Sequence, residues 1–179
     1  MTEVKSANPE RFDLECSMDY YENVVVHYLR ADRAIFINTE CCIQLNPANN
    51  PDMSGAHWYC DCVAADFRNK IVWLCEISYS KSLGSLIAKD GKGKGLAGRL
   101  KGWHDNWDAL CSAIVRDSFL PADWPVRPWI FVPEHLKPKL EKLLDRICGT
   151  TPKFCPRITA LEDVQPWKFP SWNRTYRED

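Results

Sequence analysis

The chain has 179 residues, of which 45% are hydrophobic, and a formal net charge of −1 at pH 7. This length suits one domain with a sizeable buried core. The near-neutral charge excludes a general electrostatic attraction to nucleic acid or to a membrane surface. The charge is nevertheless uneven: residues 1–66 hold eleven acids and four Lys or Arg, whereas residues 81–101 hold one acid and six Lys or Arg.

The nine cysteines are odd in number and lie mostly in apolar runs, which is typical of reduced thiols rather than of a disulfide framework. Residues 1–16 are polar, which predicts a loosely ordered leader and no signal peptide. No apolar run approaches the roughly 18 residues of a membrane span. We therefore expect a cytoplasmic protein without a membrane segment.

The first half of the chain predicts a helix followed by a hairpin. Apolar side chains at helical spacing favour a helix from Ser17 to Arg30. Residues 33–45 fit either a strand or a second helical segment, and the Asn- and Pro-rich residues 46–55 predict a loop. Two runs rich in aromatic and β-branched residues, 58–65 and 71–78, flank a short polar break and predict a β-hairpin.

The second half alternates helices with short strands. The expected elements are a basic loop or broken helix entry after residue 80, an amphipathic helix over 96–118, a buried strand at 129–132, a helix over 135–148 ended by Gly149, and a short strand at 157–161. This order predicts a single α/β domain over residues 17–150, with a mixed central sheet and a central hairpin flanked by helices. A Pro- and Trp-rich extension, residues 151–179, is expected to pack on it.

Each hairpin strand carries one acid, Asp61 or Glu76, where an apolar residue is expected. With the turn centred between Arg68 and Asn69, paired residue numbers sum to 137 and Asp61 faces Glu76, with Cβ atoms roughly 4.5–5.5 Å apart. Two such charges repel each other unless a cation lies between them. The alternative is an offset register in which each acid is solvated at a sheet edge.

Two other motifs carry little weight. Residues 93–98, GKGLAG, match the dinucleotide pattern G-x-G-x-x-G, but no strand runs into Gly93 as that fingerprint requires. Cys60 and Cys62 have no matching Cys or His pair at zinc-ligand spacing, and strand alternation directs both away from Asp61.

The basic segment follows directly from the strand that bears Glu76. It is either a solvated loop or a surface that meets the phosphates of a nucleic acid beside a metal held by the acids. The candidate nucleic-acid-binding residues are Lys89, Lys92, Lys94, Arg99 and Lys101.

The order of a helix with an acid, a strand with an Asp, a strand with a Glu, and then helix, strand and helix resembles the PD-(D/E)XK, or restriction-endonuclease-like, superfamily of nucleases. In motif the resemblance covers Tyr59-Cys60-Asp61 and Glu76-Ile77-Ser78. It implies that Asp61, Glu76 and the backbone carbonyl of Ile77 bind Mg²⁺ or Mn²⁺, and that Glu22 matches the helix acid of some members. Such a site hydrolyses phosphodiester bonds.

The chain departs from that motif at one important position. Ser78 stands where the family has a catalytic lysine, and serine cannot supply a positive charge. Lys81, three residues further on, is the candidate substitute, so the expected catalytic set is Asp61, Glu76, Ser78 and Lys81. The resemblance thus implies a metal-dependent nuclease. The alternative is a catalytically inactive nuclease-fold module that binds nucleic acid, a protein partner or a second copy of itself.

Overall fold

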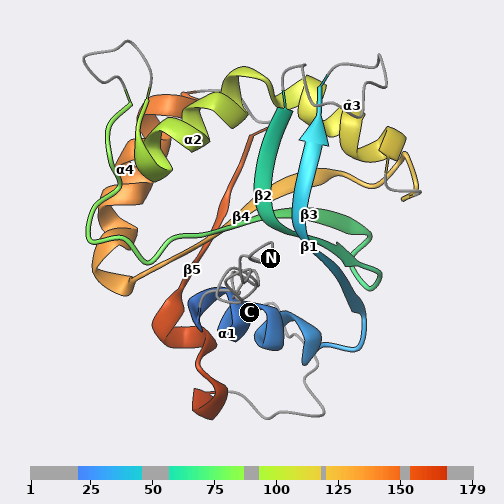
Figure 1. The fold of residues 1–179 in the computed structure, drawn as a ribbon, viewed down its shortest axis with the longest axis horizontal. Helices are drawn as coiled ribbons and strands as arrows, with labels where there is room; N and C mark the ends of the chain where they lie inside the picture. The colour runs from blue at the N-terminus through green and yellow to red at the C-terminus, as the bar shows by residue number, and fades with distance from the viewer. Residues whose placement is uncertain (1–19, 46–56, 87–92, 118–119, 150–153, 169–179) are drawn as a thin grey trace, which may run out of the picture.

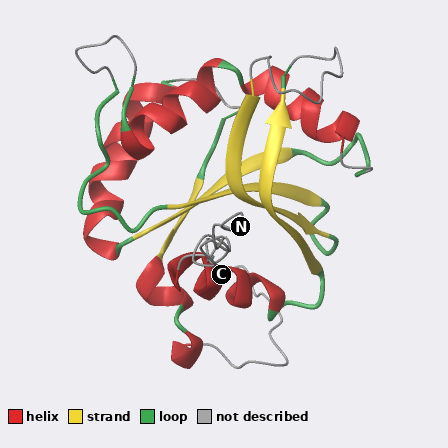
Figure 2. Ribbon diagram, viewed as in Figure 1, coloured by secondary structure: helices red, strands yellow, loops and turns green. Residues whose placement is uncertain are grey.

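The computed structural model describes residues 20–45, 57–86, 93–117, 120–149 and 154–168. These residues form a mixed five-stranded sheet, in the order β1-β2-β3-β4-β5, with helices on both faces (Figures 1 and 2). β1, β2 and β3 pair antiparallel, whereas β4 and β5 continue the sheet parallel to β3. The strands are β1 (Ile35–Gln44), β2 (His57–Asp66), β3 (Ile71–Ile77), β4 (Val126–Val132) and β5 (Arg157–Ala160).

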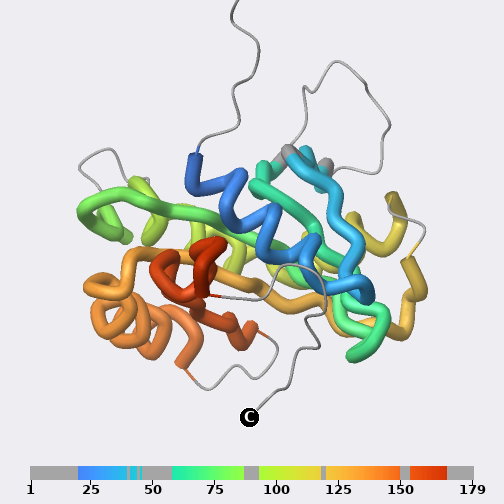
Figure 3. The backbone as a smooth tube through the Cα atoms, turned by 90° about the horizontal axis from the view of Figure 1, so that it is seen from below, coloured from blue at the N-terminus to red at the C-terminus, as the bar shows by residue number. Residues whose placement is uncertain are grey.

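Two apolar cores lie on opposite faces of the sheet. One is formed with helix α1, which crosses the strands in Figure 3, and the other with α2, α3 and α4. The apolar side chains of each helix face the sheet because they recur at three- and four-residue steps. The helices are α1 (Tyr20–Arg30), α2 (Gly95–Asp105), α3 (Trp107–Asp117) and α4 (Lys137–Cys148), and the short turns are η1 (Glu134–Leu136), η2 (Leu161–Val164) and η3 (Pro166–Lys168).

The expected α/β class with a mixed sheet flanked by helices is confirmed, and the open choice at residues 33–45 resolves to strand β1. The expectation of one continuous helix over 96–118 is wrong, because α2 and α3 are separate helices that meet at Asn106. The Asn106 side chain donates to the carbonyl of Gly102 at 2.9 Å. An asparagine side chain competes in this way with the helix's own hydrogen bonds.

The C-terminal region is part of the sheet and of both cores, and does not merely lie on the surface of the domain. β5 pairs with β4, and Leu161 and Val164 in η2 are buried in the core beneath α1. Phe154 is buried in the other core, against Trp107. The predicted leader, residues 1–16, and the end of the extension, residues 169–179, lie outside the described residues.

The turn between β2 and β3 is held by two buried aspartates. Asp66 Oδ1 accepts hydrogen bonds from the backbone N–H groups of Arg68 and Asn69, each at 3.0 Å. The Arg68 guanidinium donates to both carboxylate oxygens of Asp32, at 2.7 and 2.9 Å. The strands pair from Asp66 with Ile71 to Cys62 with Cys75, so paired numbers sum to 137 and the predicted register is confirmed.

Within the described part of the chain, all eight cysteines are free thiols. No helix there has both the length and the apolar character needed to cross a membrane.

Replacing Asp66 with alanine should destabilise the protein by about 1–3 kcal/mol, because two backbone N–H groups in a tight turn lose their acceptor. Urea unfolding measures this loss, and Asp66→Asn should recover much of it because the amide oxygen can still accept both bonds. Asp123→Ala, at an exposed position, is the matched control. Equal stability of Asp66→Ala and the control would contradict the role of the Asp66 side chain in holding the turn.

Candidate functional site

The two hairpin acids lie where the β2–β3 ladder ends. The confirmed register, continued by one residue, places Asp61 opposite Glu76, as predicted. Asp61 Oδ2 accepts a hydrogen bond from the backbone N–H of Ile77 at 2.5 Å, so the Asp61 side chain reaches across to β3 beside Glu76. Both acids therefore belong to one site at the end of the hairpin.

Glu76 is a buried acid with one paired oxygen and one unpaired oxygen. Its Oε1 accepts from Nη1 of Arg99, which projects from the second turn of α2. Its Oε2 is buried and has no hydrogen-bond partner among the described residues. A buried carboxylate oxygen without a partner is costly, so this oxygen is the place where a proton or a cation would stabilise the site.

Burial raises the pKa of Glu76 to about 8, and the negative charges of Asp61 and Glu22 add to that rise while Arg99 opposes it. The pKa of Asp61 is also raised, chiefly by burial, against the lowering effects of the Ile77 N–H and of Arg99. Of the charged groups that act on the pKa of Glu76, Asp61 and Glu22 are acids and Arg99 is a base. The site therefore favours the uptake of further positive charge near neutral pH.

The donors of this site suit a hard cation. Carboxylates and a backbone carbonyl are oxygen ligands, and Mg²⁺ is commonly bound through one or two carboxylates with water and substrate phosphate completing its coordination. In the described ranges no group of three or more His, Cys, Asp or Glu side chains is placed to hold a metal ion. Asp61 and Glu76 offer two carboxylates, which are the kind of donor that Mg²⁺ or Mn²⁺ takes.

The cysteines beside Asp61 do not form a metal site with it. Cys60 is buried in the core under α2, α3 and α4, whereas Cys62 is buried in the core under α1. The two thiols thus take part in different cores, so the expectation that strand alternation directs both to one face, away from Asp61, is wrong for this pair.

Arg99 makes a contact that the sequence did not predict. Its role as a nucleic-acid-binding residue stays a prediction, and its guanidinium pairs with Glu76. A signal for this was present, because Arg99 precedes the fully buried Leu100 and thus lies at the border of the α2 face that packs on the sheet.

Most of the other predicted site residues make contacts of their own, apart from Glu76 and Arg99. Ser78 is half-buried, and its backbone N–H donates to the carbonyl of Phe131 at 2.9 Å. Lys81 is exposed and lines a pocket against α4. Lys94 is exposed at the start of α2, and Lys101 pairs with Asp105 one turn along the same helix. Lys89 and Lys92 lie outside the described residues.

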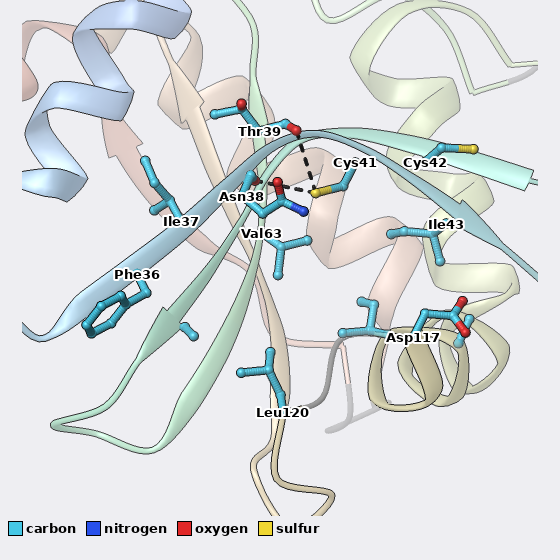
Figure 4. Close-up of a pocket in the computed structure, with 13 residues that line it drawn as sticks. Phe36, Ile37, Asn38, Thr39, Cys41, Cys42, Ile43, Val63, Asp117 and Leu120 are labelled. Carbon is cyan, nitrogen blue, oxygen red and sulfur yellow. Dashed lines mark hydrogen bonds between the residues drawn. The ribbon is translucent and has the colours of Figure 1, made fainter.

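A second chemical feature, which the sequence did not single out, lies in an apolar pocket of about 590 Å³ between β1 and α3 (Figure 4). The Cys41 thiol in its wall lies 3.4 Å from the carbonyl oxygen of Asn38. A hydrogen bond from Cys60, its cross-strand partner, lowers the pKa of Cys41 to about 7. Cys41 is thus more readily ionised than an ordinary cysteine.

Comparison with known proteins identifies no family, because no family model matches the chain and no curated protein matches it in sequence. The function of the protein has to be inferred from the chemistry of Asp61, Glu76 and Arg99.

Replacing Glu76 with glutamine should make the protein more stable than the wild type at high pH. The folded-state pKa of about 8 lies above the ordinary value of 4.5, so the wild type loses stability as the pH rises through that interval, and below it the carboxyl contributes nothing. Glutamine stays neutral throughout. The advantage should reach on the order of 5 kcal/mol by pH 9, since the pKa rises from 4.5 to about 8 and one pKa unit corresponds to ~1.4 kcal/mol.

Urea unfolding from pH 4 to 9 measures this difference, with Glu141→Gln, at an exposed position on α4, as the control. Parallel pH profiles for wild type and Glu76→Gln would show that Glu76 does not titrate in this way.

Proposed function

We propose that this protein is a metal-dependent nuclease of the restriction-endonuclease-like type, which hydrolyses phosphodiester bonds of nucleic acid with Mg²⁺ or Mn²⁺. The observation that carries the proposal is the buried Oε2 of Glu76 beside Asp61, which has no hydrogen-bond partner within the described part of the chain. A fold that gathers two acids and leaves one oxygen unsatisfied gains stability when a cation binds there.

The order of elements supports the same proposal. A helix with Glu22 precedes three antiparallel strands, the second and third of which bear Asp61 and Glu76. Helices and a strand parallel to β3 then follow. This is the order that the resemblance to the PD-(D/E)XK superfamily implies. It puts the acids where the β2–β3 ladder ends, and solvent and substrate can approach them there because Asp61 is only half-buried.

Asp61, Glu76 and the carbonyl of Ile77 are the groups that would hold the ion. When bound, Mg²⁺ or Mn²⁺ supplies a more acidic water molecule for attack on phosphorus and stabilises charge on the leaving oxygen. Because the pKa of Glu76 is about 8, its carboxyl gives up a proton as the ion enters. Metal affinity should therefore increase with pH up to about that value.

Arg99 provides the positive charge that Ser78 cannot. Its side chain is 43% exposed, so the guanidinium reaches solvent while it is paired with Glu76. A guanidinium has five N–H donors, which leaves donors for a phosphate oxygen of the substrate. Arg99 would thus orient the phosphate and stabilise the negative charge that develops on it, while the bond to Asp61 from the Ile77 N–H orients that acid.

Asp61→Asn and Glu76→Gln should each weaken Mn²⁺ binding at least about tenfold and abolish cleavage, because each removes a charged oxygen ligand. Calorimetric titration with Mn²⁺ and Mg²⁺ at pH 8, and cleavage of labelled DNA and RNA with either ion, are the measurements. Glu141→Gln should match the wild type in both. Metal-dependent cleavage that survives both substitutions would overturn the assignment of these acids.

Arg99→Met should lower the cleavage rate by roughly 10²–10³-fold, the usual effect of losing one donor to a developing charge. Its metal affinity at pH 9 should be retained or increased, because a competing positive charge has been removed. Arg99→Lys should recover part of the rate, and Lys101→Met on the same helix is the control. A loss of metal affinity in Arg99→Met at pH 9, in proportion to its loss of rate, would contradict a role towards the substrate.

The second candidate function is a nuclease-fold module without catalysis that binds nucleic acid or a protein partner. Two observations favour it: Ser78 occupies the position of the motif lysine, and Arg99 already neutralises Glu76 without an ion. The same titration separates the two functions. Absence of Mn²⁺ and Mg²⁺ binding at pH 8, together with retained binding of a nucleic acid, would support the inactive module.

A further inference from the structure

A second pocket, the basic groove, lies between helix α4 and the segment that leaves β3. Its volume is about 640 Å³, and its walls are residues 81–86 on one side and the side chains of Lys139, Lys142 and Arg146 on the other. In Figure 1 the segment after β3 runs beside α4. The floor is apolar and includes Ala97 of α2.

Four cations line this groove. Lys139, Lys142 and Arg146 are three and four residues apart, which places them on one face of α4, and Lys81 faces them from the other wall. All four residues are exposed. Among the described residues that line the groove, none is acidic. The groove therefore concentrates positive charge around an open volume.

The three cations lie on one face of α4. At about 100° per residue they fall within roughly 60° of one another, and Glu141 falls on the far side of the helix, whereas Asp145, three residues after Lys142, lies at the border of their face. Like charges three and four residues apart repel each other and destabilise the helix that carries them. The three cations therefore carry a cost that an anionic ligand in the groove would offset.

The groove is built on a fixed frame. The Ala97 N–H donates to the Leu83 carbonyl at 2.7 Å, and the backbones of Ser85 and Lys94 exchange two hydrogen bonds. Gly84 has a φ of +79°, and a Cβ there would lie 2.1 Å from the carbonyl oxygen of Lys94. The wall that holds Lys81 is thus fastened to the start of α2, the helix that carries Arg99.

The groove continues from the acidic site along the chain. The strand with Glu76 leads directly into residues 81–86, and α2 contributes Arg99 to the acids and Ala97 to the groove. A polyanion with regularly spaced charges could occupy both places at once. A single phosphate would satisfy only one of them.

We propose that the basic groove binds backbone phosphates of a nucleic acid that lie beside the phosphate at Asp61 and Glu76. This inference rests on the proposed function, because it takes the occupant of the acidic site to be a phosphodiester. Lys81, Lys139, Lys142 and Arg146 supply the contacts, which read charge and spacing rather than base sequence.

The test is fluorescence anisotropy of labelled 20-nucleotide duplex DNA, single-stranded DNA and single-stranded RNA, in EDTA and over a series of salt concentrations. The variant Lys139→Gln/Lys142→Gln/Arg146→Gln should bind the preferred nucleic acid at least tenfold more weakly at low salt. A plot of the logarithm of its association constant against the logarithm of the salt concentration should be less steep by about 2–3. Each lost phosphate contact reduces the magnitude of that slope by ~0.9 for duplex DNA or ~0.7 for a single strand.

The matched control is Arg33→Gln/Arg127→Gln/Lys168→Gln, which removes the same charge from exposed positions that do not line the groove. It should keep the wild-type slope, and the triple Lys139→Arg/Lys142→Arg/Arg146→Lys variant should keep the affinity. Thermal melting establishes that each variant is folded. The proposal is overturned if the groove variant keeps the wild-type salt slope. It is also overturned if the control loses as much affinity for nucleic acid as the groove variant does.

Two further measurements separate this proposal from binding of small anions alone and from failure of the metal site. Inorganic phosphate or AMP should compete only weakly, and binding of these small anions in the groove without binding of any of the three nucleic acids would overturn the proposal. The groove variant should keep the wild-type affinity for Mn²⁺ at pH 8, because neither Asp61 nor Glu76 lines the groove. Weaker binding of nucleic acid with unchanged Mn²⁺ affinity would thus test the groove separately from the metal site, and an equal loss of both in a folded variant would overturn the proposal.

Discussion

The pairing register of β2 with β3 is the constraint on which the candidate site depends. Side chains alternate between the faces of a strand, so a slip of one residue would move Asp61 to the face covered by α1 and separate it from Glu76. Asp66 prevents that slip by accepting two backbone hydrogen bonds within the turn, and Arg68 ties the turn to Asp32 at the end of α1. Residues at one end of the hairpin thus set the geometry of the acids at the other.

The site combines groups that are unfavourable for folding. Glu76 is buried, a second acid lies opposite it, and one of its oxygens has no partner among the described residues. Arg99 offsets part of this cost, but a buried ion pair seldom recovers the full loss of hydration. Such costs are concentrated at functional sites, where charge has to be available to a ligand. The like-charged face of α4 is a second example in the same molecule.

The sequence predicted those features that arise from local pattern. The polar break at residues 67–70 and its symmetric apolar flanks were enough to predict the hairpin register, and the alternation of helices and strands was enough to predict a mixed α/β sheet. The division of the helix at Asn106 was missed because the apolar spacing continues through it. It depends on a side-chain hydrogen bond to Gly102 that spacing does not reveal.

Contacts between elements were the part that the sequence could not supply. The pairing of Arg99 with Glu76 depends on how α2 packs over β3, and the grouping of Lys81 with α4 brings together residues about 60 positions apart in the chain. Hydrophobic periodicity indicates which face of a helix is buried, but not which strand lies beneath it. Charged residues near the border of a buried face were therefore assigned to the surface by default.

The chain separations within the site have a consequence for how the protein folds. The Asp61 carboxylate and the Ile77 N–H are 16 residues apart, whereas Arg99 and Glu76 are 23 residues apart and on elements joined by a crossover. Contacts that close shorter loops generally form earlier. We therefore expect the hairpin to bring its two acids together before α2 brings the balancing charge. Docking of α2 is then the step that relieves this repulsion, so the hairpin and the helix should reach their native positions cooperatively.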